Sequence, residues 1–308
     1  MIGNYPITWL VTEIISVVLF VACLLHAMKQ PNAKARVLEL LCFLIGAAIF
    51  EHAGVLLSKQ YDYDQHRILM TGIVPLSTLM IEAVILYTGM IVFEHFDMPK
   101  WSAIWVVGLY ASFQDMGIDP VYVHDRYMFN GVLSGQWNWH HTYANAFFGI
   151  PFFNFSGWLY MTGIYAALIY LGRWVHKKYQ NDFVAVMYPL LSGLLLIIPF
   201  SLVGFVLITG QDRTGELVRM IVNLIIPVIL VAIYWKGLKP LDLKKDRIVF
   251  IVTIVLDLYN LIVGFGLGIK ISYIPITVVA VLHFAFLYYL YTNAKHVDQE
   301  EVPLEAGA

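Results

Sequence analysis

The sequence has few charged residues for its length. Of its 308 residues, 13% are charged and 60% are hydrophobic, whereas roughly a quarter of the residues of a soluble domain are charged. So few charges cannot cover the surface of a water-soluble fold of this size. This excludes a soluble globular protein and predicts that lipid surrounds much of the chain. The net charge of −2 also lacks the basic excess typical of nucleic-acid binding, so we expect no nucleic-acid partner.

The sequence is also poor in cysteine and in the motifs of common cofactor sites. Its two cysteines, Cys23 and Cys42, stand within apolar runs, so we predict small buried side chains and neither a disulfide nor a metal site. There is no glycine-rich phosphate loop, no repeated Asp-rich box like that of metal-dependent prenyl transferases, and no Cys/His spacing typical of zinc sites. We therefore expect neither a metal nor a cofactor.

Long apolar runs are what the sequence has in abundance. A bilayer core is crossed by about 20 apolar residues in helical form. Runs of this kind lie at about 7–28, 37–57, 73–93, 152–172, 185–209, 217–235, 248–269 and 274–292. A ninth run, 101–118, is shorter and is interrupted by Gln114 and Asp115. We predict an all-α polytopic membrane protein with about nine transmembrane helices, eight being the alternative, in a single domain over residues 1–294 with a disordered C-terminal tail over 295–308.

The distribution of basic residues favours nine spans. With nine spans and the N-terminus outside, thirteen of the 19 basic residues fall on the cytoplasmic side and six outside, as the positive-inside rule requires. Without the 101–118 span, the later basic clusters would lie opposite the first. We therefore predict an integral protein of a prokaryotic cell membrane with its C-terminus in the cytoplasm. The cytoplasmic residues are Lys29, Lys34, Arg36, Lys100, Arg173, Lys177, Lys178, Lys236, Lys239, Lys244, Lys245, Arg247 and Lys295.

Several carboxylic acids lie within or beside the apolar runs, where an ionised group is costly. Glu82 stands near the middle of the third run, too deep to reach the interface. Asp115 and Asp119 are four residues apart, so on a helix they share one face, with Cβ atoms roughly 6 Å apart. Together with Glu51, they form a set in which burial and mutual repulsion favour the neutral acid, the form that acts as a general acid.

Each of these polar residues also has a structural explanation. Asp119 precedes Pro120, a pair typical of helix ends. Glu13 stands near the start of the first helix and could reach the interface. Asp257, with Asn260 near it, could hydrogen-bond a neighbouring helix, and a buried His283 is more often structural than catalytic.

An aromatic segment follows the paired aspartates. It contains Trp137, Trp139 and Trp158 together with several Phe, Tyr, Asn and His residues. Such a segment is typical of an aromatic belt with a re-entrant loop at the membrane interface. The alternative is a cleft that holds a long apolar ligand and stabilises positive charge by cation–π contact.

The polar and aromatic residues of this segment and of two earlier blocks stand at characteristic spacings. The earlier positions are Glu51 with Gly54, the Tyr-Asp-Tyr at 61–63 and the Val-Pro-Leu at 74–76, and the later ones are Asp115, Asp119, Pro120, Val121, Trp137, Trp139, Tyr143, Gly149, Pro151, Asn154, Gly157 and Trp158. This pattern resembles that of the membrane-bound carotenoid-biosynthesis hydratases, over about residues 40–175 well and over the C-terminal third by hydropathy alone. Glu82 departs from the pattern, because it stands in a region where the family usually carries tryptophan.

The resemblance implies a hydro-lyase that adds water to a terminal C=C bond of an acyclic carotenoid or related polyisoprenoid lipid. It also implies membrane lipids and other enzymes of carotenoid biosynthesis as partners. Our hypothesis is that Asp115 or Asp119 donates the proton, while the other aspartate or Glu51 activates water. We assign substrate binding to six residues. They are Glu82, Trp137, Trp139, Tyr143, Asn154 and Trp158.

Two other classes of function stay open. A proton-coupled transporter or flippase of a lipid or other apolar molecule would use Glu51, Glu82 and Asp257 as a relay, although no inverted repeat is evident between the halves of the chain. The second class is a non-catalytic membrane scaffold, but this function would leave the clustered carboxyl groups unexplained.

Overall fold

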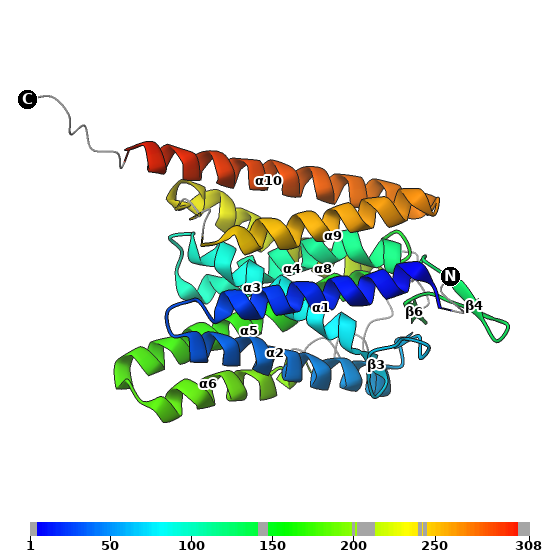
Figure 1. Ribbon diagram of the computed structural model, residues 1–308, viewed down its shortest axis with the longest axis horizontal. Coiled ribbons are helices and arrows are strands. Elements are labelled where there is room, and N and C mark those ends of the chain that lie inside the picture. Colours follow the sequence, from blue (N-terminus) through cyan, green and yellow to red (C-terminus); the bar gives the residue numbers. More distant parts are fainter. Residues whose placement is uncertain are drawn as a thin grey trace, which may run out of the picture.

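The structure is a bundle of helices that run along one common axis (Figure 1). This computed structural model describes residues 5–140, 147–198, 201, 213–239, 242 and 245–300. The nine longer helices among them are α1 (Ile7–Ala27), α2 (Ala33–Ala53), α3 (Leu76–Glu94), α4 (Ala103–Tyr122), α5 (Phe152–Tyr179), α6 (Asp182–Leu194), α8 (Arg213–Tyr234), α9 (Arg247–Gly266) and α10 (Tyr273–Glu300). The short helices are η1 (Gly54–Ser58), a π-helix that continues α2, and the 3₁₀ turns η2 (Lys100–Ser102), η3 (Trp235–Gly237) and η4 (Lys270–Ser272).

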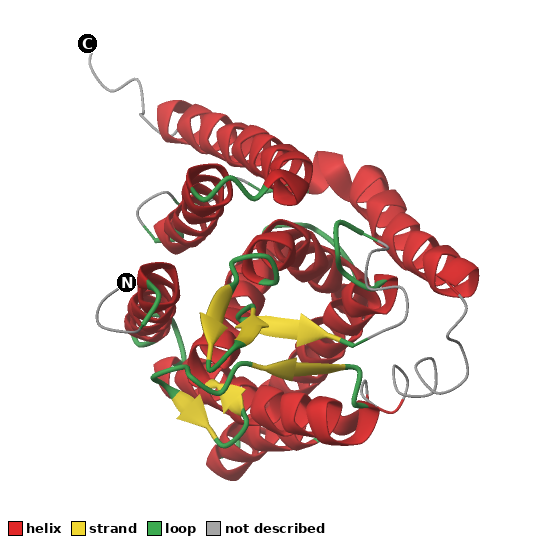
Figure 2. Cartoon of the chain, turned by 90° about the vertical axis from the view of Figure 1, so that its right-hand side faces the viewer, coloured by secondary structure: helices red, strands yellow, loops and turns green. Residues whose placement is uncertain are grey.

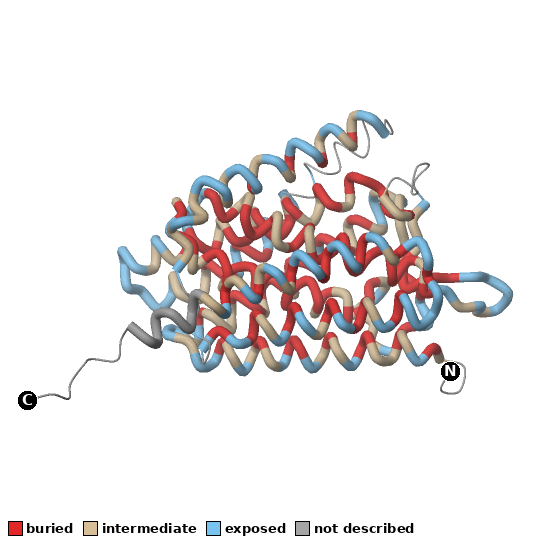
Figure 3. The backbone as a smooth tube through the Cα atoms, turned by 90° about the horizontal axis from the view of Figure 1, so that it is seen from above, coloured by how far each residue is buried: buried red, intermediate tan, exposed pale blue. Residues whose placement is uncertain are grey.

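The helices agree with the predicted all-α class. Within the described part of the chain, six are long and apolar enough to cross a membrane: α1, α2 with η1, α3, α8 with η3, α9, and η4 with α10. Exposed positions run along the outer helices, and buried positions fill the middle of the bundle (Figure 3). Many exposed side chains are large and apolar, such as Val228 and Ile229 on α8 and Ile262 on α9. Such apolar faces fit a lipid environment.

The two ends of the bundle differ. Six short strands and the N-terminus lie at one end, here called the strand end, while the last helix runs out at the other (Figure 1). At the opposite end, the connection before α9 is held by a hydrogen bond from the Lys239 amide to the His95 carbonyl (2.7 Å) and by His26 Nε2 at 2.6 Å from the Lys245 carbonyl oxygen. Many of the basic residues predicted to be cytoplasmic lie in the connections at this end or in the helix turns beside them, and we call it the basic end.

The strands are the main feature that hydropathy did not predict. They are β1 (Tyr61–Tyr63), β2 (Met70–Thr71), β3 (Val74–Pro75), β4 (Tyr127–Phe129), β5 (Val132–Ser134) and β6 (Trp137–Trp139). They form three antiparallel pairs, β1–β6, β2–β3 and β4–β5, and they lie across the end of the helix bundle (Figure 2). In the β1–β6 pair, Tyr61 lies opposite Trp139 and Tyr63 opposite Trp137. Two aromatic segments far apart in sequence thus form one cover.

Helix α4 runs further than the sequence predicts. The Asp119–Pro120 pair does not end it, because Pro120 stands within the helix and Tyr122 is its last residue. A proline in the last turn removes few of the helix's backbone hydrogen bonds, and helices of membrane proteins tolerate it. Helix α10 likewise continues through Glu300, beyond the domain boundary predicted at residue 294, and residues 301–308 lie outside the described part.

Close packing of α4 against α5 sets the geometry of the polar residues. A Cβ atom at Gly163 of α5 would clash with the Ile104 carbonyl oxygen of α4, and one at Gly108 would lie 2.5 Å from the Leu159 carbonyl oxygen. Ser112 Oγ also donates to the Phe155 carbonyl oxygen at 2.8 Å. Small residues allow two backbones to approach in this way. The helix of Asp115 and Asp119 is therefore held close against the start of α5.

Candidate functional site

A single cavity at the strand end collects the residues singled out from the sequence. It contains about 910 Å³ of unfilled space, including its open mouth, and is bounded by α1 to α5, η1, β1 and β6. Tyr143 lies outside the described residues, so nothing is said of its position. All eight other predicted residues line the cavity: Glu51, Glu82, Asp115, Asp119, Trp137, Trp139, Asn154 and Trp158.

The two aspartates share one amide donor. Asn154 Nδ2 donates to Asp115 Oδ2 at 2.6 Å and to Asp119 Oδ2 at 2.8 Å. Both carboxyl side chains are buried, at 1% and 3% exposure. The i, i+4 spacing places them on one face of α4, and the close α4–α5 contact brings the first turn of α5 against that face. The predicted pairing of Asp115 with Asp119 is confirmed, and its link to Asn154 comes from the tertiary structure.

Glu51 is held by two phenols from strand β1. Its Oε2 accepts hydrogen bonds from Tyr61 Oη at 2.9 Å and Tyr63 Oη at 2.6 Å. Burial, helped by the nearby Glu51 carboxylate, raises the pKa of both tyrosines well above its ordinary value, so the phenols stay protonated and keep donating. Gly54 makes room for this contact, because a Cβ atom there would clash with Tyr61 Oη.

Glu82 lies on α3 without a comparable partner. Its side chain is 2% exposed, and no described residue offers its Oε2 a hydrogen bond. It faces the same cavity as Glu51 and Asp115. A buried carboxyl group without a partner is costly unless it is neutral or meets water or ligand. The Glu82 carboxyl group is therefore available to water or to a ligand in the cavity.

The tryptophans form an aromatic cover over the carboxyl groups. The Trp139 ring lies 5.0 Å from the Tyr61 ring and 5.6 Å from the Phe153 ring, while the Trp137 ring lies 5.3 Å from that of Tyr122. Strand β6 thus presses both indoles against the cavity. Trp158 lines it from α5. This arrangement fits a lined cleft better than a loose interfacial belt.

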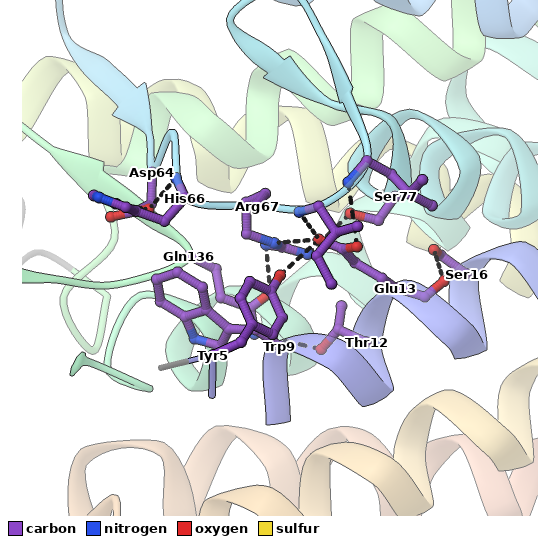
Figure 4. Close-up of polar contacts among 12 residues, drawn as sticks. Tyr5, Trp9, Thr12, Glu13, Ser16, Asp64, His66, Arg67, Ser77 and Gln136 are labelled. Atoms are coloured by element: carbon purple, nitrogen blue, oxygen red, sulfur yellow. Dashed lines mark hydrogen bonds and ion pairs between the residues drawn. The ribbon is translucent and has the colours of Figure 1, made fainter. Parts of the chain in front are cut away.

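The structure adds Arg67, one of the six basic residues that the nine-span topology predicts to lie outside. Its side chain is buried and lines the cavity. Arg67 Nε lies 3.0 Å from Glu13 Oε1, Nη1 donates to Gln136 Oε1 at 2.8 Å, and Nη2 donates to Ser77 Oγ at 2.9 Å. Figure 4 shows these contacts radiating from the guanidinium group to α1, α3 and the segment before β6. No sequence signal points to this residue, since an arginine in a polar loop has the pattern of an exposed charge.

Glu13 also differs from its predicted position at the interface. It is 3% exposed and accepts hydrogen bonds from the Ile68 and Leu69 amides, at 3.0 and 3.3 Å, and from Tyr5 Oη at 2.8 Å. These donors, together with Arg67, hold the loop before β2 against the start of α1 (Figure 4). The carboxylate is buried here because charged and backbone partners replace water.

Asp257 and His283 belong to a different place. His283 Nδ1 lies 2.9 Å from Asp257 Oδ2, between α10 and α9, and neither residue lines the cavity. The relay of Glu51, Glu82 and Asp257 is therefore not assembled in one site. Among the described residues, no group of three or more His, Cys, Asp and Glu side chains is placed to hold a metal ion. Comparison with protein-family models, curated proteins and solved structures finds no match to this chain.

Proposed function

We propose that this protein is an integral membrane hydratase that adds water to a terminal trisubstituted C=C bond of an acyclic carotenoid or related polyisoprenoid. One observation carries the proposal: the Asn154 amide joins two buried carboxyl groups inside a tryptophan-lined cavity. Two carboxyl groups this close repel each other when both are ionised, so the pair retains a proton that it can donate.

The chemistry follows from three parts of the cavity. The Asp115–Asp119 pair gives its proton to the less substituted alkene carbon, which leaves a tertiary carbocation. The tryptophan faces stabilise that cation. Water attacks the cation and loses one proton to Glu51, and return of that proton to the aspartate pair completes the addition of one H₂O. Acid–base assistance of this kind contributes about 10²–10⁴-fold, and exclusion of bulk water strengthens the charge stabilisation.

The proposed topology is nine spans with the N-terminus outside the cell membrane and the C-terminus in the cytoplasm. Besides the six most apolar helices, α4 and α5 have the length to cross, with 20 and 28 residues. The remaining predicted span is the run 185–209, which begins within α6 and of which residues 199–200 and 202–209 lie outside the described part. An odd number of spans agrees with the two termini lying at opposite ends of the bundle (Figure 1). The cavity then opens in the outer half of the membrane.

A direct test is to express the protein in lycopene-producing cells and look for a product heavier by one water. Asp115→Asn and Asp119→Asn should each abolish it, because an amide cannot supply the proton. Asp182→Asn, the same change on α6 at the basic end, is the matched control and should leave the product unchanged. Hydration that persists in both cavity variants would overturn the assignment of the acid.

A second cavity favours the transporter or flippase as the other candidate. About 830 Å³ of unfilled space at the basic end is lined by residues of α1, α2, α3 and α5, four helices that also line the first cavity. On α3, Leu86 of the second cavity follows Glu82 of the first by one helical turn. A carrier would open these cavities in turn. Proton uptake by proteoliposomes on addition of a polyisoprenoid, without any hydrated product, would favour this function over the hydratase.

A further inference from the structure

The cavity has a buried end and a more open end. The acids Glu82, Asp115 and Asp119 lie at the end formed by α3 and α4, with at most 3% exposure. Half-buried lining residues cluster on another side, formed by η1, β6 and the start of α5. They are Ser58, Trp139, Asn154, Gly157 and Trp158, with Tyr61 of β1 beside them, whereas Thr78 is the one half-buried lining residue on α3. The acids are therefore reached through this second side.

The surroundings of this opening are apolar. Leu56 and Leu57 on η1 are 60% and 70% exposed, and η1 is the last turn of a span that begins at Ala33. Exposed leucines on a spanning helix face lipid rather than water. The opening between η1 and α5 thus lies where the acyl-chain region of the bilayer meets the protein.

Gly157 stands on α5 at this opening and leaves space there. A Cβ atom at Gly157 would have no atom of the described residues within 4 Å. Gly54, which also lines the cavity, behaves oppositely, since a Cβ atom there would clash with Tyr61 Oη. Five α5 residues line the cavity and share one helix face: Phe153, Asn154, Gly157, Trp158 and Met161. Because Gly157 has no side chain, this face of α5 has open space at Gly157, close to Asn154 and the paired aspartates.

We propose that the apolar chain of a long polyisoprenoid enters sideways from the lipid between η1 and α5 and lies along Gly157, with its terminal double bond at Asp115 and Asp119. This inference rests on the proposed hydratase function and adds the route and the residue that admits the chain. A terminal alkene reaches the acids in this way without the rest of the molecule leaving the membrane. Only the end group needs to be enclosed, so the cavity does not have to hold the whole substrate.

The test is a bulky substitution at the opening, Gly157→Leu, compared on a long and a short substrate. Lycopene needs the route, whereas sulcatone carries the same dimethyl-substituted alkene on a short chain and does not. We expect Gly157→Leu to lower hydration of lycopene by about tenfold or more, as obstructed pockets do, and to lower hydration of sulcatone by a much smaller factor. Gly266→Leu is the matched control, because an added Cβ at Gly266, at the end of α9 and outside the cavity, also meets no described atom.

Unchanged hydration of lycopene by Gly157→Leu, or an equal loss with both substrates, would overturn the inference. Binding of lycopene tests the route separately from the proposed function. Lycopene should quench the tryptophan fluorescence of the wild type and of Gly157→Ser, and it should quench that of Gly157→Leu far less. If the wild type binds lycopene yet hydrates no alkene, the hydratase fails while this pattern of binding still supports the route. If Gly157→Leu does not fold, Gly157→Val gives the same comparison, and equal quenching by Val and Ser variants contradicts the route.

Discussion

At the scale of single residues, this protein is organised around carboxyl groups with different partners. Asp115 and Asp119 share the Asn154 amide, Glu51 has two phenol donors, and Glu82 has no described donor for its Oε2. Similar residues therefore have different surroundings, and in the proposed hydratase these decide which carboxyl group gives a proton and which accepts one.

Removal of the phenol nearest to Glu51 tests its role as the base. Tyr63→Phe leaves the carboxylate with Tyr61 as its phenol donor, so we expect hydration of lycopene to fall roughly tenfold to hundredfold. Tyr288→Phe removes a phenol of a residue that is 70% exposed on α10 and should change nothing. Initial rates of product formation give the comparison, and equal rates in all three proteins would contradict the role of Glu51.

Asn154 is the second residue whose role can be separated from folding. Asn154→Asp keeps the size of the side chain but replaces the shared donor with a third carboxyl group beside Asp115 and Asp119. We expect it to lose hydration, while Asn154→Gln, which keeps the amide, retains a measurable part. Product analysis by mass, with expression level as the control, distinguishes them. Full activity of Asn154→Asp would mean that the amide donor is not required.

At the scale of elements, the strand cover is attached to the helices by Arg67. Its contacts reach Glu13 on α1, Ser77 on α3 and Gln136 just before β6 (Figure 4). Strand β6 carries Trp137 and Trp139, so the position of the indoles depends on this buried ion pair. Arg67 thus ties the cover to α1 and α3.

Breaking this ion pair should be costly. Arg67→Met leaves the Glu13 carboxylate buried without its charged partner, and loss of one member of a buried pair typically costs about 3–5 kcal/mol. We expect a clear fall in the melting temperature in detergent and a loss of lycopene-dependent quenching. Arg126→Met, at an exposed residue after α4, is the control. A double variant with Glu13→Gln should recover part of the loss, since no buried charge is then left alone.

At the scale of the whole molecule, two polar centres lie at opposite ends of an apolar bundle. Arg173 on α5 donates to Glu39 on α2 and to Glu94 on α3, the latter at 2.6 Å, and Arg36 reaches Glu94 at 3.0 Å. Tyr188 on α6 adds a hydrogen bond to Glu39 at 2.6 Å. This network ties four helices together at the basic end, while the cavity takes the strand end. The bundle therefore has one end joined by ion pairs and one end that holds the tryptophan-lined cavity.

The orientation of these ends can be measured. Met128 on β4 is 61% exposed at the strand end, and Tyr179, the last residue of α5, is 62% exposed at the basic end. We expect Met128→Cys to react with a membrane-impermeant maleimide in whole cells, and Tyr179→Cys only after permeabilisation. The native Cys23 and Cys42 are buried, so the background should be low. Labelling of Tyr179→Cys in intact cells would reverse the proposed topology.

Hydropathy by itself determined where the long apolar helices lie, because the length and apolarity of a run are local properties of the sequence. In lipid, these two properties decide which segments form spanning helices. The i, i+4 spacing likewise determined that Asp115 and Asp119 share a face. Only the tertiary structure decided that Tyr61 and Tyr63 meet Glu51, that β1 pairs with β6, that Arg67 meets Glu13, and that Asn154 joins the aspartates. These contacts join side chains that are 10 to 78 positions apart in the chain, and such pairings depend on how helices pack against one another rather than on any pattern within a single segment.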